Sequence, residues 1–126
     1  MRNMSFMLTQ EQIRDKTKDV TRRLGWWFLK GGELVMACEK CQGLELGEKI
    51  IRIRPIRIVS SRGERLDAMR KDDVAREGFL GGTEFFISMF CAEMKCKPRT
   101  LVNRIEFEYL TAFEERMIMA EYSDAH

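Results

Sequence analysis

The chain has one histidine, two prolines and no long apolar run. The histidine is His126, the last residue, so neither a histidine-based metal site nor a catalytic triad that contains histidine is expected. No apolar run approaches the roughly 20 residues that a helix needs to cross a bilayer. Residues 1–4 also lack the apolar core of a signal peptide. These absences predict a cytoplasmic protein without a membrane partner.

The net charge is also small, because 22 lysines and arginines are offset by 20 aspartates and glutamates. Affinity for a nucleic acid would therefore have to come from local clusters of cations and not from the chain as a whole. Cations do cluster within residues 14–30 and again within residues 52–65. The length of 126 residues and the 44% content of hydrophobic residues predict one globular domain, present as a monomer or a weak homodimer.

The first third of the chain predicts two strands, a short helix and a cationic extended segment. Residues 5–8 are apolar and predict the first strand. Thr9 and Gln12 have the spacing of a capping box, which predicts a helix over residues 10–16. Residues 17–23 then gather three cations and two threonines around a valine, as an extended segment. The apolar residues 34–37 predict a buried strand.

An aromatic run, Trp26-Trp27-Phe28-Leu29, lies between these two segments and is followed by a glycine turn at residues 30–33. Such a run usually belongs to a hydrophobic core, and we expect it to be buried there. The alternative is that the aromatic rings stack on unpaired nucleobases, as they do in proteins that bind single strands.

The clearest strand pattern covers residues 50–59, where isoleucines alternate with arginines. The alternation changes phase at Pro55, which predicts a bulge or a bend because proline cannot donate a hydrogen bond to a neighbouring strand. Residues 60–64 have the composition of a turn. The arginines of this strand are expected to form a basic row on its exposed face, made of Arg52, Arg54 and Arg57.

The second half of the chain predicts two helices and one strand. Asp72 is a favourable N-cap for a short helix over residues 73–77, and Gly78 is positioned to end that helix. Residues 84–94 predict a second helix, capped by Thr83, and residues 101–110 alternate as a half-buried strand does. The second helix has an apolar face that consists of Phe85, Phe86, Met89, Phe90 and Met94.

These elements together predict an α+β fold, with a small curved mixed sheet or partial β-barrel and helices packed at its ends. We assign residues 1–110 to this domain. Residues 111–126 form a C-terminal tail with a weak helical pattern, which packs on the domain, pairs with another copy or frays.

Four cysteines are the only other candidates for a metal site. Cys38 and Cys41 form a Cys-x-x-Cys pair, but Cys91 and Cys96 do not have that spacing. A zinc site would need all four to converge in space. We therefore interpret them as free thiols and expect neither a metal nor a cofactor.

Seven short blocks follow one another along residues 5–110. They are Ser5-Phe6, Gln12-Ile13-Arg14, Thr17-Lys18-x-x-Thr21-Arg22-Arg23, Leu29-Lys30-x-Gly32-Glu33, Ile56-Arg57-Ile58-Val59, Ala75-Arg76-Glu77-Gly78-Phe79 and Arg104-Ile105-Glu106-Phe107. In order and spacing, these blocks resemble the ASCH domain, a branch of the PUA-like superfamily. The resemblance implies a β-barrel-like fold with a cleft that binds RNA, modified bases or nucleosides.

The resemblance also implies a set of reactive residues. Some ASCH proteins remove the acyl group of N4-acetylated cytidine with a Lys-x-x-Thr pair and a distant glutamate, which Lys18, Thr21 and Glu77 match in order. In that role the lysine is the base, the threonine the nucleophile, and the glutamate orients the lysine. Other ASCH proteins are ribonucleases, and the ion pair Lys18–Glu77 could also be purely structural. Amidohydrolase, ribonuclease and non-catalytic RNA-binding module therefore remain three alternatives.

Ligand binding is expected from cations and an aromatic residue around the same cleft. Arginines beside the Lys-x-x-Thr pair and on the strand at residues 50–59 could contact phosphates of RNA or of a nucleotide. An aromatic side chain could stack on a base. The alternative is a solvated basic face. The candidate binding residues are Arg22, Arg23, Trp26, Arg52, Arg54 and Arg57.

Overall fold

The computed structural model describes residues 1–124, which form a five-stranded mixed sheet in the order β1-β3-β4-β5-β2. β1 pairs with β3 in parallel, and the other neighbours are antiparallel. His126 lies outside the described residues. The strands are β1 (Arg2–Ser5), β2 (Val20–Arg23), β3 (Leu34–Cys38), β4 (Arg52–Arg65) and β5 (Leu101–Tyr109).

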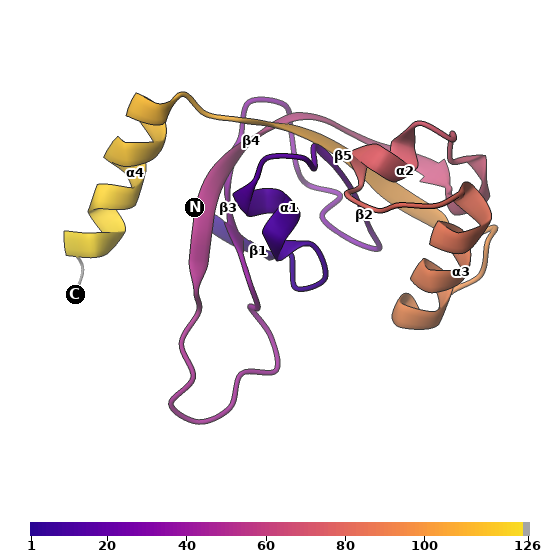
Figure 1. The fold of residues 1–126 in the computed structure, drawn as a ribbon, viewed down its shortest axis with the longest axis horizontal. Helices are drawn as coiled ribbons and strands as arrows, with labels where there is room; N and C mark the ends of the chain where they lie inside the picture. The colour runs from indigo at the N-terminus through magenta and orange to yellow at the C-terminus, as the bar shows by residue number, and fades with distance from the viewer. Residues whose placement is uncertain (125–126) are drawn as a thin grey trace.

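The described residues also form the helices α1 (Gln10–Arg14), α2 (Asp73–Arg76), α3 (Thr83–Met94) and α4 (Ala112–Asp124), with a 3-10 helix at Leu66–Ala68. The sheet curves around α1, while α2 and α3 lie at one end of the molecule and α4 lies at the other (Figure 1). This arrangement confirms the predicted α+β fold. No helix within residues 1–124 is long and apolar enough to cross a membrane.

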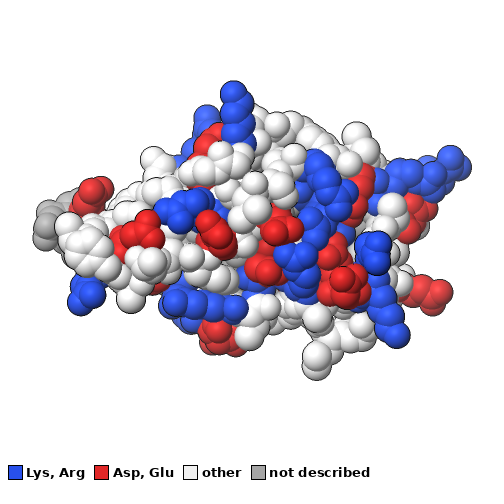
Figure 2. All heavy atoms as spheres, turned by 90° about the horizontal axis from the view of Figure 1, so that it is seen from above, with Lys and Arg blue, Asp and Glu red and all other residues white. Residues whose placement is uncertain are grey.

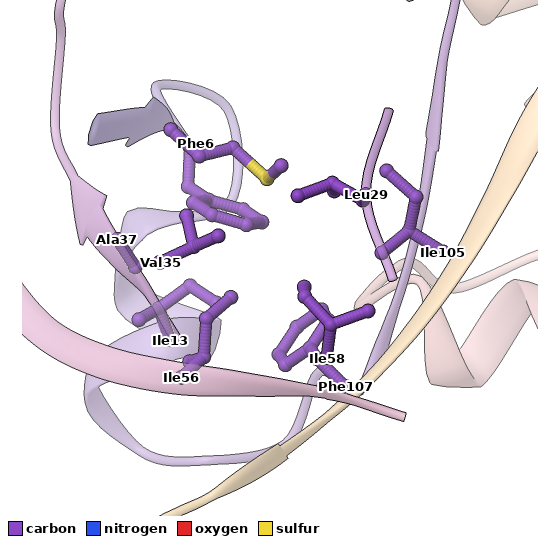
Figure 3. Close-up of a cluster of buried hydrophobic side chains, with 10 residues drawn as sticks. Phe6, Ile13, Leu29, Val35, Ala37, Ile56, Ile58, Ile105 and Phe107 are labelled. Carbon is purple, nitrogen blue, oxygen red and sulfur yellow. The ribbon is translucent and has the colours of Figure 1, made fainter. Parts of the chain in front are cut away.

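Two hydrophobic clusters form the core. In the first, side chains of β1, β3, β4 and β5 meet those of α1, and Figure 3 shows Phe6, Ile13 and Leu29 among them. The Phe6 ring packs edge-on against Phe107, with 5.9 Å between ring centroids. The second cluster joins α2 and α3 to the beginning of β5 and consists of Leu66, Met69, Val74, Phe86, Phe90 and Val102.

The prediction for the first strand was wrong, because the strand covers Arg2–Ser5 and not residues 5–8. β1 takes its register from β3, where Ser5 pairs with Cys38, and the chain then turns with a hydrogen bond from Thr9 N to Phe6 O. Met7 and Leu8 are exposed in that turn. The predicted capping box does not form either, since the Gln12 side chain donates to the carbonyl oxygen of Gly78.

The predicted turn at residues 60–64 is also wrong, because β4 continues to Arg65. β5 pairs with β4 from Ile56 through Arg65, and this long-range pairing overrides the local turn composition. Pro55 lies just before that paired stretch, where its missing N–H costs no bond to β5. The register shifts on both sides of Pro55, one opposite Cys38 and one at Val59.

The other predicted elements lie close to their predicted positions, but two predictions of burial were wrong. α3 begins at Thr83 and buries Phe86 and Phe90, whereas Phe85 and Met94 are exposed. In the aromatic run of residues 26–29 only Leu29 is buried. Helix α4 forms within the segment that has the weak helical pattern.

Gly78 ends α2 in the manner predicted and fixes the position of Glu77. Its φ is +93°, the left-handed region, and its N–H donates to the carbonyl oxygen of Ala75 at 2.9 Å. A Cβ at this position would lie 3.0 Å from Cγ of Gln12. The chain can therefore reverse directly after Glu77 only because residue 78 has no side chain.

We predict that Gly78→Ala lowers the free energy of unfolding by about 1–2 kcal/mol, because alanine disfavours the left-handed conformation and crowds Gln12. Gly25→Ala is the matched control, since Gly25 has an ordinary φ and no atom within 4 Å of an added Cβ. It should change the free energy of unfolding by less than about 0.5 kcal/mol. Urea denaturation of the two variants measures the difference, and equal losses would contradict the prediction.

Candidate functional site

A pocket of about 240 Å³ lies where the two hydrophobic clusters meet. The three candidate catalytic residues and two of the six candidate binding residues line this pocket: Lys18, Thr21 and Glu77, with Arg22 and Arg23. The remaining wall is mostly apolar, because it is formed by the turn after β1 and by one side of α3. It consists of Ser5, Phe6, Met7, Leu8, Thr9, Phe79, Phe86, Met89, Phe90, Glu93 and Met94.

Two segments far apart in the sequence bring Lys18 and Glu77 together. Lys18 lies just before β2, Glu77 directly follows α2, and a backbone hydrogen bond from Asp19 to Arg76 joins the segments. The Lys18 Nζ lies 2.9 Å from Oε1 of Glu77 and 2.6 Å from its carbonyl oxygen. Each of the two residues is only 2% exposed, so this is a buried ion pair.

The environment lowers the pKa of Lys18. Burial is the largest cause, because it disfavours the charged amine. Glu77 opposes this effect, while the positive charges of Arg23 and Arg22 add to it. A neutral lysine amine, which is able to accept a proton, is therefore reached at lower pH than for an ordinary lysine.

Thr21 lies on β2 beside Arg23. The Arg23 Nε donates to the Thr21 hydroxyl oxygen at 3.2 Å, and its Nη2 donates to the carbonyl oxygen of Ser5 at 2.6 Å. The guanidinium also lies 4.8 Å from the centre of the Phe6 ring. Burial lowers the pKa of Arg23 to about 10. Since the Thr21 oxygen accepts this hydrogen bond, its own proton remains free to be donated to a base.

Behind the pocket, Arg22 begins a chain of buried ion pairs. It contacts Glu77 at 3.0 Å, and Asp73 and Glu64 at 2.6 Å each. Asp73 in turn accepts two hydrogen bonds from Arg104, at 2.8 and 3.1 Å. These arginine partners hold the pKa of Asp73 far below its usual range. The charge of Arg22 is therefore neutralised by these carboxylates, and its role is to fix their positions beside the pocket and not to bind a ligand.

Sequence reasoning missed Asp73 and Arg104. Asp73 was predicted only as the first residue of a helix, and Arg104 only as part of the half-buried strand at residues 101–110. The structure buries both side chains, because each neutralises the other. The one available signal in the sequence was that Asp73 stands four positions before Glu77, and both carboxylates pair with Arg22.

Four of the predicted binding residues do not lie in the pocket. Arg54 pairs with Glu115 at 3.5 Å, and Arg57 pairs with Glu114 at 2.8 Å. Both carboxylates belong to α4, so the prediction of an exposed basic row was wrong. The other two residues are Arg52, whose guanidinium lies 4.6 Å from the Tyr122 ring, and Trp26, which packs against the first hydrophobic cluster.

The charged surface agrees with this pairing. Figure 2 shows lysine and arginine side chains interleaved with aspartate and glutamate side chains across the face that it presents. Such a face offers no continuous row of free cations to a phosphate backbone. A ligand is therefore more readily held by the pocket than by this surface.

All four cysteines are free thiols, and they do not form the converging site that zinc would need. Among residues 1–124, no three side chains of histidine, cysteine, aspartate or glutamate are grouped so as to hold a metal ion. Burial and the neighbouring Cys41 raise the pKa of Cys38 to about 12, so its thiol stays protonated.

Comparison with solved structures gives the fold of the chain. It is similar to the crystal structure of an ASCH domain from Lactobacillus crispatus JV V101, with a TM-score of 0.56 and 17% identity over 85% of this chain and 77% of the other. It is also similar to a protein from Enterococcus faecalis V583 of the family DUF984, with a TM-score of 0.58 and 12% identity over 87% and 76% of the two chains. No protein-family model and no curated protein matches the sequence. The predicted resemblance to the ASCH domain is therefore confirmed as a likeness of fold.

We predict that Asp73→Asn lowers the free energy of unfolding by about 3–5 kcal/mol, because it leaves the buried Arg22 and Arg104 without their shared countercharge. Asp67→Asn is the matched control, since Asp67 pairs with Arg65 on the surface at 2.6 Å. Its loss should not exceed about 1 kcal/mol. Urea denaturation measures both, and a loss at position 73 as small as that of the control would contradict the prediction.

Proposed function

We propose that the pocket binds a nucleoside or an unstacked base of RNA and hydrolyses an amide on it, as an amidohydrolase of N4-acetylcytidine type. One observation carries this proposal. Lys18, Thr21 and Glu77, which match the reactive residues of such ASCH proteins by motif order, line one small pocket in which the pKa of the lysine is lowered.

The size and walls of the pocket support a ligand of this kind. Sites for drug-sized ligands occupy about 300–1,000 Å³, so a pocket of about 240 Å³ accepts a single base or nucleoside and not a folded nucleic acid. Phe79, Phe86 and Phe90 give one side of the pocket an aromatic character, which suits a planar base.

The proposed reaction begins with Lys18 as a neutral amine. The lysine takes the hydroxyl proton of Thr21, whose oxygen attacks the carbonyl carbon of the amide and forms a tetrahedral intermediate. The carbon–nitrogen bond then breaks, and the Lys18 ammonium returns its proton to the leaving exocyclic nitrogen. Water, deprotonated by Lys18, cleaves the resulting ester on Thr21. The products are the carboxylic acid and cytidine, and the threonine hydroxyl is restored.

Glu77 and Arg23 have supporting roles in this scheme. The Glu77 carboxylate accepts a hydrogen bond from Lys18 Nζ, so it orients the amine and stabilises it once it carries the proton. The Arg23 Nε donates to Thr21 Oγ1 and stabilises the negative charge that develops on this oxygen as it is deprotonated.

A pocket that binds RNA or a nucleoside without chemistry is the second candidate. The burial of the Lys18–Glu77 pair favours it, because a buried, hydrogen-bonded ion pair can also serve only to hold the fold. Under this alternative, both residues would stabilise the fold and no product would form.

We predict that Thr21→Val abolishes hydrolysis of N4-acetylcytidine, with a loss of at least about 1,000-fold in kcat, because the nucleophile is removed while the shape of the side chain is kept. Thr17→Val is the matched control: Thr17 is exposed and does not line the pocket, so its turnover should equal that of the wild type. Mass spectrometry of the products measures both.

The same assay separates the three alternatives. Cytidine that appears with the wild type and not with Thr21→Val supports the amidohydrolase. Cleavage of a mixed-sequence RNA with the same dependence on Thr21 would instead favour a ribonuclease. Absence of product from either substrate would leave the non-catalytic pocket.

We also predict that kcat/KM rises with pH and reaches a plateau, with an apparent pKa below the value of about 10.4 for an ordinary lysine. The protonated amine at low pH cannot accept the threonine proton, and deprotonation restores the base. Since Arg23 lowers the pKa of Lys18, Arg23→Gln should move this rise to higher pH. Initial rates across a pH series measure the profile, and a rate that falls as pH increases over the same range would contradict the assignment of Lys18 as the base.

A further inference from the structure

The loop between β2 and β3 holds two large aromatic side chains half in solvent. Trp27 and Phe28 have 51% and 50% of their surfaces exposed, although their neighbours Trp26 and Leu29 pack against the core. Adjacent exposed aromatic side chains are typical of binding surfaces. They lie outside the pocket, and the proposed chemistry does not use them.

This loop is anchored by hydrogen bonds to its backbone and by a buried leucine. Asn103, which is fully buried on β5, donates hydrogen bonds to the backbone oxygens of Gly25 and Trp26, at 3.2 and 3.0 Å. Leu29 points into the first hydrophobic cluster, as Figure 3 shows. The two exposed rings are therefore presented by an anchored segment and not by a loose one.

The backbone of the loop also carries strain. Trp26 has a φ of 65°, a left-handed conformation that is unfavourable for a residue with a side chain. Strain of this kind persists where the surrounding structure enforces it, and it is concentrated at functional sites. Trp27 rests on β4, where a Cβ on Gly63 would lie 3.5 Å from its ring. The strained turn at Trp26 thus directs Trp27 and Phe28 outward in fixed positions.

A cation accompanies the aromatic pair. The guanidinium of Arg2, on β1, lies 4.0 Å from the centre of the Phe28 ring. Surfaces that bind single-stranded nucleic acids combine aromatic rings, on which bases stack, with cations that contact the backbone. The Arg2 guanidinium covers one face of the Phe28 ring and places a positive charge beside the two aromatic side chains.

This aromatic loop lies next to the pocket. β2 ends at Arg23, which lines the pocket, and the loop begins with the following residue. β1 runs from Arg2, beside Phe28, to Ser5, which lines the pocket and accepts a hydrogen bond from Arg23. Three steps along a strand cover about 10 Å. A nucleotide that neighbours the base in the pocket is therefore within reach of the loop.

We infer that Trp27 and Phe28 form a stacking platform for bases that flank the target base, so that the substrate is a modified cytidine within single-stranded RNA and not the free nucleoside. This inference rests on the proposed function for the base in the pocket. The platform adds binding of the flanking nucleotides, while the chemistry stays at Lys18, Thr21 and Glu77.

The experiment compares two substrates, free N4-acetylcytidine and a five-nucleotide RNA with N4-acetylcytidine in the middle. Trp27→Ala and Phe28→Ala should each lower kcat/KM for the RNA by about 5- to 150-fold, which is the range for loss of one stacked base. The kcat/KM for the free nucleoside should not change. Phe113→Ala is the matched control, because Phe113 is 67% exposed on α4, at the other end of the molecule from α3, and should affect neither substrate.

Trp27→Phe should restore most of the activity on RNA, since a phenyl ring also stacks. A third substrate is the same RNA in which the two flanking nucleotides lack bases. The wild type should hydrolyse its amide as slowly as Trp27→Ala hydrolyses the complete RNA. Equal losses on the RNA and on the free nucleoside, or no loss on either, would overturn the inference. The proposed function would stand in both cases, provided that the wild type hydrolyses the amide.

A wild type that hydrolyses no amide would contradict the proposed function. In that case a measurement of RNA binding still tests the inference. The fluorescence anisotropy of a labelled, unmodified five-nucleotide RNA reports the Kd. Trp27→Ala should weaken this binding by about 5- to 150-fold, and Phe113→Ala should leave it unchanged. RNA binding that is equal in both variants, together with loss of self-association in Trp27→Ala alone, would identify the loop as a contact between copies of the chain instead.

Discussion

The structure depends on a chain of alternating buried charges that runs from Lys18 through Glu77, Arg22 and Asp73 to Arg104. It connects the approach to β2, the end of α2 and the middle of β5. Each charge would be costly to bury alone, and each is tolerated because its neighbours compensate it. The members therefore fix one another, and with them the angle at which the α2 and α3 end of the molecule meets the sheet.

This constraint explains why the pocket lies where it does. Three members of the charged chain, Lys18, Arg22 and Glu77, line the pocket together with apolar side chains of both hydrophobic clusters. The pocket is therefore lined by charged side chains on one side and by apolar side chains on the others. Lys18 stands at one end of the chain of charges, and Glu77, the one carboxylate with which it pairs among the described residues, is shared with Arg22. The amine is thus buried deeply and compensated incompletely, which is the condition that lowers the pKa of a lysine.

Local patterns were enough to predict the helices and most strands, but not the features that arise from distant pairing. Gly78 marked the end of α2, because a glycine that ends a helix is a property of a short segment. Lys18, Thr21 and Glu77, which the resemblance indicated, line one pocket. β4 extends through a stretch of turn-like composition since β5, some forty residues later, supplies its partner. Arg54 and Arg57 looked solvated because no sequence pattern shows that the acidic side of α4 lies against them. Burial of charge is decided by three-dimensional proximity, which composition does not carry.

The small size of the pocket bears on how its ligand is bound. A ligand that fills about 240 Å³ has few atoms, and the affinity available from so few contacts is limited. Lys18 and Arg22 both pair with Glu77, so these three charges contribute little to ground-state binding. Interactions made equally in the ground and transition states lower KM without raising kcat, and they need not be near the reacting atoms. Under the proposed function, an anchored aromatic loop beside the pocket would supply this uniform binding energy, and the groups in the pocket would then act on the transition state.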